Sequence, residues 1–238
     1  FLILILAICP NARSLSINIA TDALREPAPA VAEWSHKTLI FLKSALIIFV
    51  RNPVLGKVKS RLAATLGSEK ALEIYKALLK HTRDISVDLS CNKFIFYEDC
   101  VNENDLWPND IYLKYLQQGS NLGDRMKNAF KQLYDDGYGK VMIIGSDCYE
   151  LSGNVIENAF HLLSENNIVI GPASDGGYYL LGMKKFIPKL FEDKKWSSGT
   201  VYIDTINQIE KLDCKFCSLE LLSDVDVESD IDFDQLNK

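Results

Sequence analysis

The sequence predicts an α/β fold built around a mostly parallel β-sheet. Short apolar runs rich in β-branched residues recur along the chain, and amphipathic segments with a helical period separate most of them. The chain has 238 residues, of which 47% are hydrophobic and 24% charged, and these values exclude a disordered or fibrous protein. The length corresponds to one large domain or two small ones.

The predicted strands follow the apolar runs. The first, residues 45–50, is apolar throughout and is followed by Asn52-Pro53, as expected for a buried strand that ends in a turn. Further strands are predicted at residues 93–97, 111–116, 140–144, 167–170, 176–182 and 215–219.

The predicted helices lie mostly between these strands. In residues 66–85 a buried stripe recurs at three- and four-residue spacing, and Ser68 is the expected N-cap. The stripe consists of Leu72, Tyr75, Leu78, Leu79 and Thr82. Other helices are predicted at residues 122–134, 154–163 and 200–212, with a short closing helix at 230–236.

Residues 1–42 show no clear period. We expect them to form an extension outside the domain, which then covers residues 43–238. The apolar run at residues 1–8 is well short of the ~20 residues that span a bilayer, so no stable membrane insertion is expected. A truncated signal peptide is the alternative interpretation of this run.

Charge is distributed unevenly along the chain, whose formal net charge is −6. Residues 43–68 hold five basic residues and no acidic one, whereas residues 213–238 hold eight acidic residues and two basic ones. A locally basic segment in an acidic protein favours a small anionic ligand and argues against nucleic acid as a partner.

A basic loop, residues 51–61, follows the first predicted strand. Its cations and its one glycine are Arg51, Lys57, Lys59, Arg61 and Gly56. Ligands of open α/β sheets bind beyond the carboxyl ends of the strands, so we expect these cations to contact phosphate oxygens. The loop is not a P-loop, because Arg51 replaces the first glycine and Val58 the Ser/Thr. A solvated basic loop is the competing interpretation.

Asp147 follows the predicted strand 140–144 after Gly145 and Ser146. A carboxylate at the end of a buried strand is costly unless it is paired or binds a cation. Asp147 is therefore a candidate ligand of Mg²⁺ or Mn²⁺, and Ser146 a candidate substrate contact beside it. The alternative is that Asp147 caps the next helix.

A third candidate loop contains Asp175, Gly176 and Gly177. The two glycines indicate a close approach of the backbone to another group. Asp175 could ligate a metal, orient an acceptor hydroxyl or act as a base. An Asp-Gly hairpin turn is the alternative.

Six segments of the chain, taken in order, carry a family resemblance. They are FVRNPVLGKVKSRL (49–62), QQGSNLGDRM (117–126), GSDC (145–148), GPASDGGYYLLG (171–182), WSSGTV (196–201) and DVDVESDI (224–231). Together they resemble a bacterial family, the domain of unknown function 2064, also called arsenosugar-biosynthesis-type glycosyltransferases. Relatives of this family include the guanylyltransferases of molybdopterin and of phospholactate.

The resemblance implies a three-layer α/β/α fold of the GT-A, nucleotide-diphospho-sugar transferase type, which is Rossmann-like and has a mixed, mostly parallel sheet. It places the basic loop at the nucleotide phosphates, Asp147 at the metal and Asp175 beside the acceptor. A further family loop, assigned to the nucleotide, is matched by Gly123, Asp124 and Arg125. The acidic tail does not fit an EF-hand, because Ser229 and Gln235 occupy its Gly and Glu positions. The resemblance implies a closing helix there instead.

These features lead to the hypothesis of a metal-dependent glycosyltransferase with Asp147 and Asp175 as catalytic residues. It would use a nucleotide-diphospho-sugar donor and a small-molecule acceptor. One alternative is a nucleotidyltransferase that uses a nucleoside triphosphate and releases pyrophosphate, and another is a non-catalytic nucleotide-binding module. Nucleotide supply and cysteines without a disulfide framework favour the cytoplasm. The donor, the acceptor and the oligomeric state stay open.

Overall fold

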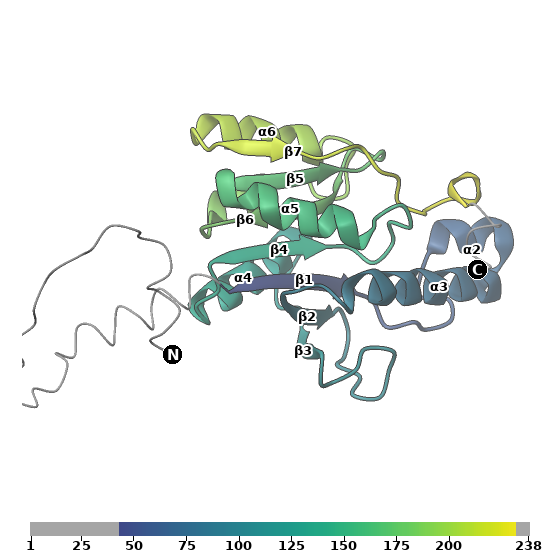
Figure 1. The fold of residues 1–238 in the computed structure, drawn as a ribbon. Helices are drawn as coiled ribbons and strands as arrows, with labels where there is room; N and C mark the ends of the chain where they lie inside the picture. Colours follow the sequence, from purple (N-terminus) through teal and green to yellow (C-terminus); the bar gives the residue numbers. More distant parts are fainter. Residues whose placement is uncertain (1–42, 232–238) are drawn as a thin grey trace, which may run out of the picture. The chain divides into compact units, whose positions relative to one another are not determined.

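The computed structural model describes residues 43–231, shown as a ribbon in Figure 1. The predicted extension at residues 1–42 and all but the first two residues of the predicted helix 230–236 therefore lie outside the described residues.

The strands in residues 43–231 form one sheet in the order β3-β2-β1-β4-β6-β5-β7. Every neighbouring pair is parallel except β6, which runs antiparallel to both β4 and β5. The strands are β1 Ser44–Val50, β2 Asn92–Tyr97, β3 Tyr112–Leu116, β4 Lys140–Ile144, β5 Ile168–Pro172, β6 Tyr178–Met183 and β7 Phe216–Ser218. The predicted α/β fold with a mixed, mostly parallel sheet is confirmed.

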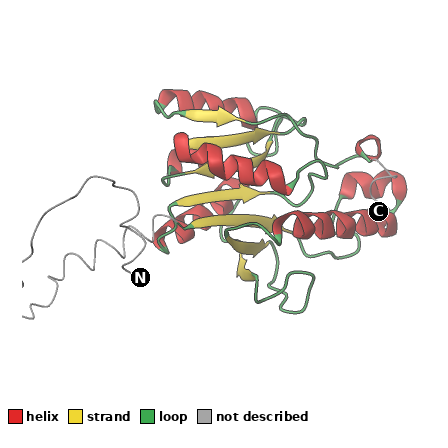
Figure 2. Ribbon diagram, in the orientation of Figure 1, coloured by secondary structure: helices red, strands yellow, loops and turns green. Residues whose placement is uncertain are grey.

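Helices cover both faces of this sheet and give three layers (Figure 2). The helices α3 (Ser68–Ser86) and α5 (Gly153–Glu165) pack on one face, and α4 (Leu122–Asp135) and α6 (Val201–Lys211) on the other. Successive residues of β1 alternate between the two cores: Leu46 packs with α3 and α5, and Ile47 with α4 and α6. The single-turn 3₁₀ helices η1 (Pro188–Phe191) and η2 (Glu228–Asp230) complete the elements of the described chain.

The helical segment after β1 differs from its prediction. The helix predicted over residues 66–85 forms as α3, but a second helix that was not predicted, α2 (Ser60–Leu66), precedes it, and the two are separated at Gly67. Gly67 has φ 82° and ψ 156°, a conformation that interrupts a helix and that glycine adopts readily. Ser68 is consequently the first helical residue and Gly67 the N-cap, so the predicted cap is wrong. The predicted stripe of α3 is confirmed as packing on the core.

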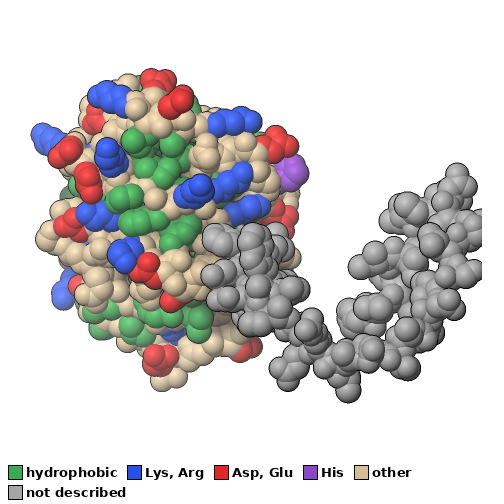
Figure 3. Space-filling view, turned by 90° about the vertical axis from the view of Figure 1, so that its left-hand side faces the viewer, with side chains coloured by type: hydrophobic (Ala, Val, Ile, Leu, Met, Phe, Trp, Pro, Cys, Tyr) green, Lys and Arg blue, Asp and Glu red, His purple; other side chains and the backbone are tan. Residues whose placement is uncertain are grey.

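The face at the amino ends of the parallel strands is drawn in Figure 3. Among the described residues of this face, basic and acidic side chains are interspersed around small apolar areas. Within residues 43–231, no helix is both long enough and apolar enough to cross a membrane.

Candidate functional site

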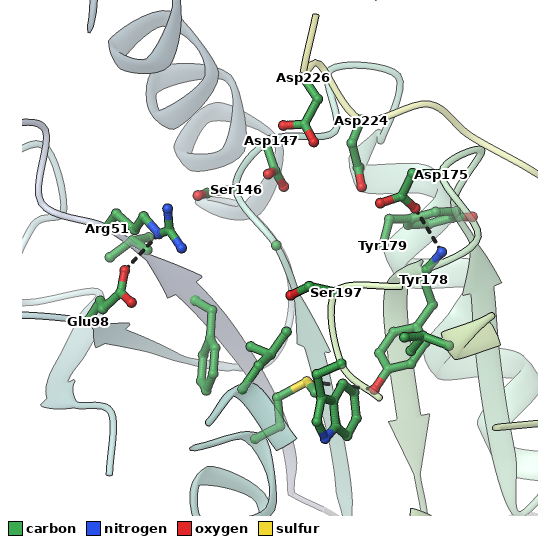
Figure 4. A pocket seen from close by; sticks show the side chains of 18 of the residues that line it. Arg51, Glu98, Ser146, Asp147, Asp175, Tyr178, Tyr179, Ser197, Asp224 and Asp226 are labelled. Carbon is green, nitrogen blue, oxygen red and sulfur yellow. Dashed lines mark hydrogen bonds and ion pairs between the residues drawn. The ribbon is translucent and has the colours of Figure 1, made fainter. Parts of the chain in front are cut away.

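A cleft of about 750 Å³ opens where β1 and β4 end (Figure 4). Its walls come from the loop after β1, the turn after β4, the loop before β6, residues 196–199 and the acidic segment at 224–226. Because β1 and β4 are parallel neighbours, their carboxyl ends lie at the same edge of the sheet. This is the edge at which open α/β sheets bind ligands.

Lys59 makes two ion pairs inside the cleft. Its Nζ lies 3.0 Å from Oδ2 of Asp147 and 2.9 Å from Oδ1 of Asp226, and its side chain is 7% exposed. Burial lowers the pKa of Lys59, but the two carboxylates outweigh this effect and raise it above its ordinary value. Lys59 is therefore a fully charged ammonium that joins the turn after β4 to the acidic segment.

Asp224 is the least satisfied group in this acidic region. Its Oδ1 is buried and has no hydrogen-bond partner in the described residues. Burial, followed by repulsion from Asp147 and Asp175, raises the pKa of Asp224 to about 7. Figure 4 shows these three carboxylates and Asp226 gathered on one side of the cleft.

Tyr75 of α3 connects the two strand ends. Its hydroxyl accepts a hydrogen bond from the Arg51 amide at 2.9 Å, donates to the Arg51 carbonyl at 3.1 Å and is hydrogen-bonded with Ser146. Burial raises the pKa of Tyr75, so the phenol stays protonated. This buried side chain therefore holds the start of the basic loop beside the turn that carries Asp147.

The opposite side of the cleft carries an arginine-rich network. Oε2 of Glu98 accepts from Nε of Arg51 and Oε1 accepts from Nη1 of Arg125, both at 2.7 Å. One carboxylate thus holds two guanidinium groups in place, with a local excess of one positive charge. Arg51 and Glu98 lie across the cleft from the four aspartates in Figure 4.

Trp196 lines the cleft and packs directly on the first turn of α4. A Cβ added to Gly123 would stand 2.2 Å from the indole Nε1, so only glycine allows this contact. Gly123 therefore leaves the space into which the Trp196 indole packs, and it is not among the residues that line the cleft.

The structure brings most of the sequence-predicted residues to this cleft. The predicted residues that line it are Arg51, Lys59, Arg61, Arg125, Ser146, Asp147, Asp175 and Gly177. Arg61 lies at the margin, with Nη1 3.5 Å from Oδ2 of Asp226. Lys57 is exposed outside the lining, and Gly56 forms a turn with φ 75°.

Two other predicted residues have structural contacts. Asp124 belongs to the cap of α4, where its amide donates to Oδ1 of Asn121 at 3.0 Å and its carboxylate accepts from the side chain of Asn121. Gly176 has φ 88° and lies so close to Gly199 that a Cβ would reach 2.1 Å from the Gly199 carbonyl oxygen. This contact fixes the loop that carries Asp175 against residues 196–199.

Sequence reasoning missed Asp224 and Asp226 as site residues. Residues 224–227 have no helical structure, and Glu228–Asp230 form a single 3₁₀ turn, while the predicted closing helix 230–236 lies almost wholly outside the described residues. Val225 is buried against α2 and α3 while its two neighbours line the cleft. The alternation of Asp, Val and Asp was the available signal, because alternate residues of an extended segment share a face.

The carboxylates suit a hard divalent cation. The buried oxygen of Asp224 without a partner, beside Asp147 and Asp226, is the kind of donor that Mg²⁺ or Mn²⁺ binds. As placed, no three His, Cys, Asp or Glu side chains of residues 43–231 are arranged to hold a metal ion. A site of this type needs only one or two carboxylates when substrate phosphates supply the other ligands.

The fold corresponds to the class of nucleotide-diphospho-sugar transferase-like α/β proteins. The chain belongs to the family described as uncharacterized proteins conserved in bacteria (DUF2064), whose family model matches residues 84–198. It is similar to a candidate nucleotide-diphospho-sugar transferase from Desulfovibrio desulfuricans G20, with 32% identity and a TM-score of 0.71. The match covers 77% of this chain and 82% of that one.

More distant structures share the fold alone. One is the 4-diphosphocytidyl-2C-methyl-D-erythritol synthase of Anaerococcus prevotii DSM 20548, with 14% identity, a TM-score of 0.52, and coverage of 83% of this chain and 97% of that one. Another is the inositol-1-phosphate CTP transferase of T. maritima, with 11% identity, a TM-score of 0.51, and coverage of 82% and 94%. A comparison with curated proteins found no match.

Gly123→Ala is expected to destabilise the protein, although alanine normally favours a helix over glycine by about 1 kcal/mol. The added methyl group would collide with the Trp196 indole, and overpacking of this kind costs about 1–3 kcal/mol. Urea unfolding measures the effect, and the double variant with Trp196→Ala is the control. If Gly123→Ala destabilises the Trp196→Ala protein equally, the packing explanation is wrong.

Asp224→Asn is expected to stabilise the protein at pH 8 and to have a much smaller effect at pH 5. The raised pKa means that folded Asp224 holds a proton that the unfolded chain releases, so the free energy of unfolding falls as pH rises from about 4 to about 7. Asparagine does not titrate, so the variant does not lose this part of the free energy of unfolding as pH rises. We expect the Tm at pH 8 to rise by roughly 2–6 °C. Asp88→Asn, at an exposed position outside the cleft, is the control. An equal shift at both pH values would contradict the assignment.

Proposed function

We propose that the protein is a metal-dependent glycosyltransferase that takes its donor from the nucleotide-diphospho-sugars and transfers the sugar to a small-molecule acceptor. The observation that carries the proposal is the meeting of Lys59 and Arg61 with Asp147, Asp224 and Asp226 in one cleft. Cations and carboxylates placed together suit a diphosphate that shares a divalent ion with the protein. The similarity to the Desulfovibrio protein supports the same class of donor.

In this proposal, the aspartates bind the metal ion and the basic residues bind the diphosphate of the donor. Asp147 would hold Mg²⁺ or Mn²⁺ together with Asp224 or Asp226, which lie on the same side of the cleft. When bound, the ion would supply Lewis-acid stabilisation of the negative charge on the diphosphate. Arg61 and Lys59 would add fixed positive charge to the diphosphate oxygens, which helps most where that charge grows in the transition state.

Asp175 would act on the acceptor. Its Oδ1 accepts from the Gly177 amide at 2.7 Å, which fixes the carboxylate on its loop and leaves Oδ2 for an acceptor hydroxyl. A carboxylate in this position can orient the hydroxyl or remove its proton. The close packing of Gly176 on Gly199 supports this role because it restricts the movement of the loop.

Asp147→Asn is expected to lower the rate of transfer by ~100-fold or more, by analogy with other single electrostatic groups in active sites. The assay incubates the full chain with nucleotide sugars and nucleoside triphosphates in MnCl₂ or MgCl₂, and the products are identified by mass spectrometry. Asp88→Asn serves as the control for loss of a carboxylate, and thermal unfolding checks that each variant is folded.

The products decide between the proposal and its nearest alternative. Release of a nucleoside diphosphate supports glycosyl transfer, whereas release of pyrophosphate from a triphosphate supports nucleotidyl transfer. Wild-type turnover by the folded Asp147→Asn variant would contradict the proposed role of Asp147. Tight nucleotide binding without any turnover or metal dependence would favour a non-catalytic binding module.

A further inference from the structure

The ammonium of Lys59 lies between two of the carboxylates that surround the proposed metal position. Its Nζ is within hydrogen-bonding distance of one oxygen of Asp147 and one oxygen of Asp226. A divalent ion ligated by these oxygens would need to approach them to about 2.1 Å, which brings it into the space that the ammonium fills. Two cations cannot share this space, because their repulsion would be strong in a partly buried site.

The backbone fixes the two carboxylates relative to each other. The amide of Val225, next to Asp226, donates to the Asp147 carbonyl at 2.9 Å. The amides of Asp226 and Val227 both donate to Oδ2 of Asp230 at 2.9 Å. The segments that carry the carboxylates are therefore tied together, and an exchange of cations does not require them to separate.

Lys59 is the part of this arrangement that can leave. Its ammonium stands on a flexible four-carbon side chain, whereas its backbone is held in the left-handed region, φ 46° and ψ 54°, at the N-cap of α2. The Lys59 carbonyl accepts the Ala63 amide at 2.9 Å, so the helix anchors this position. A phosphate group in the cleft would offer the ammonium a new anionic partner without movement of the loop.

We infer that Lys59 is a built-in counter-ion which competes with a free divalent cation for Asp147 and Asp226, and that the diphosphate of a nucleotide relieves this competition by drawing Lys59 away. The inference rests on the proposed function. It assigns an order to binding: the protein takes up the divalent ion weakly by itself and strongly together with a nucleoside diphosphate. The coupling is reciprocal, so the ion strengthens nucleotide binding by the same factor.

The test measures binding of Mn²⁺ to the full chain without nucleotide, by electron paramagnetic resonance of free Mn²⁺. Lys59→Met keeps most of the apolar side chain and removes the charge, so we expect it to bind Mn²⁺ at least ~10-fold more tightly than the wild type, a difference of about 1.4 kcal/mol. Lys59→Arg restores the charge and is expected to bind weakly again.

The matched control is Lys57→Met, which removes one positive charge from the same loop but at an exposed position outside the cleft. Its Mn²⁺ affinity is expected to stay within ~2-fold of the wild type, because exposed charges at a distance are screened by salt. An equal gain in Lys57→Met and Lys59→Met would show a general charge effect and would overturn the inference. Unchanged or weaker Mn²⁺ binding by Lys59→Met would also overturn it.

A second measurement uses the wild-type protein and does not depend on how any variant folds. Saturating UDP or GDP is expected to raise its Mn²⁺ affinity at least ~10-fold, after correction for Mn²⁺ bound by the nucleotide in solution, and absence of such a rise contradicts the inference. If the wild type binds Mn²⁺ with nucleotide but Lys59→Met shows no gain in its absence, only this inference fails. If neither the wild type nor any variant binds Mn²⁺ in the presence of UDP or GDP, the proposed metal-dependent function fails as well.

Discussion

The parallel pairing of β1 with β4 is the constraint on which the site depends. It places the basic loop after β1 and the Asp147 turn after β4 at the same edge of the sheet, although Lys59 and Asp147 are 88 residues apart in the chain. Lys59 joins these two segments and also reaches Asp226, 167 residues further along than itself. The apolar side chains of both strands, buried between two helical layers, therefore determine where the charges meet.

The features that were predicted correctly are those that local patterns encode. Continuous apolar runs predicted buried strands such as β1 and β4, and the spacing of Tyr75 and Leu79 predicted the buried face of α3. The rule that ligands bind beyond the carboxyl ends of strands then indicated the loops that form the cleft. Residues within two positions of a strand end, such as Arg51 and Ser146, could be proposed as site residues from sequence position alone.

The features that were missed depend on contacts between distant segments. The acidic segment enters the site because Val225 pairs with Asp147 through the backbone and buries its side chain beside α2 and α3. The alternation of Asp and Val indicates which side chains share a face, but nothing near Asp224 in the sequence encodes which segment that face lies against. Gly123 shows the same limit. A side chain at this position would collide with Trp196, which is far from it in the chain. Helix α2 was missed as well, because its first residues, Ser60 and Arg61, belong to the segment that was predicted to be the basic loop.

The electrostatics of the cleft restrict what it can bind. The four aspartates would repel a free anion. Lys59 compensates part of their negative charge, so the attraction of a free cation to this side is weaker than it would be to four carboxylates without Lys59. The opposite side holds Arg51 and Arg125 on a single glutamate and retains one positive charge. Under the proposed function, an anionic group that brings its own divalent ion would satisfy both sides at once. The unpaired oxygen of Asp224 would then gain a partner, and relief of the energetic cost of burying it would contribute to binding.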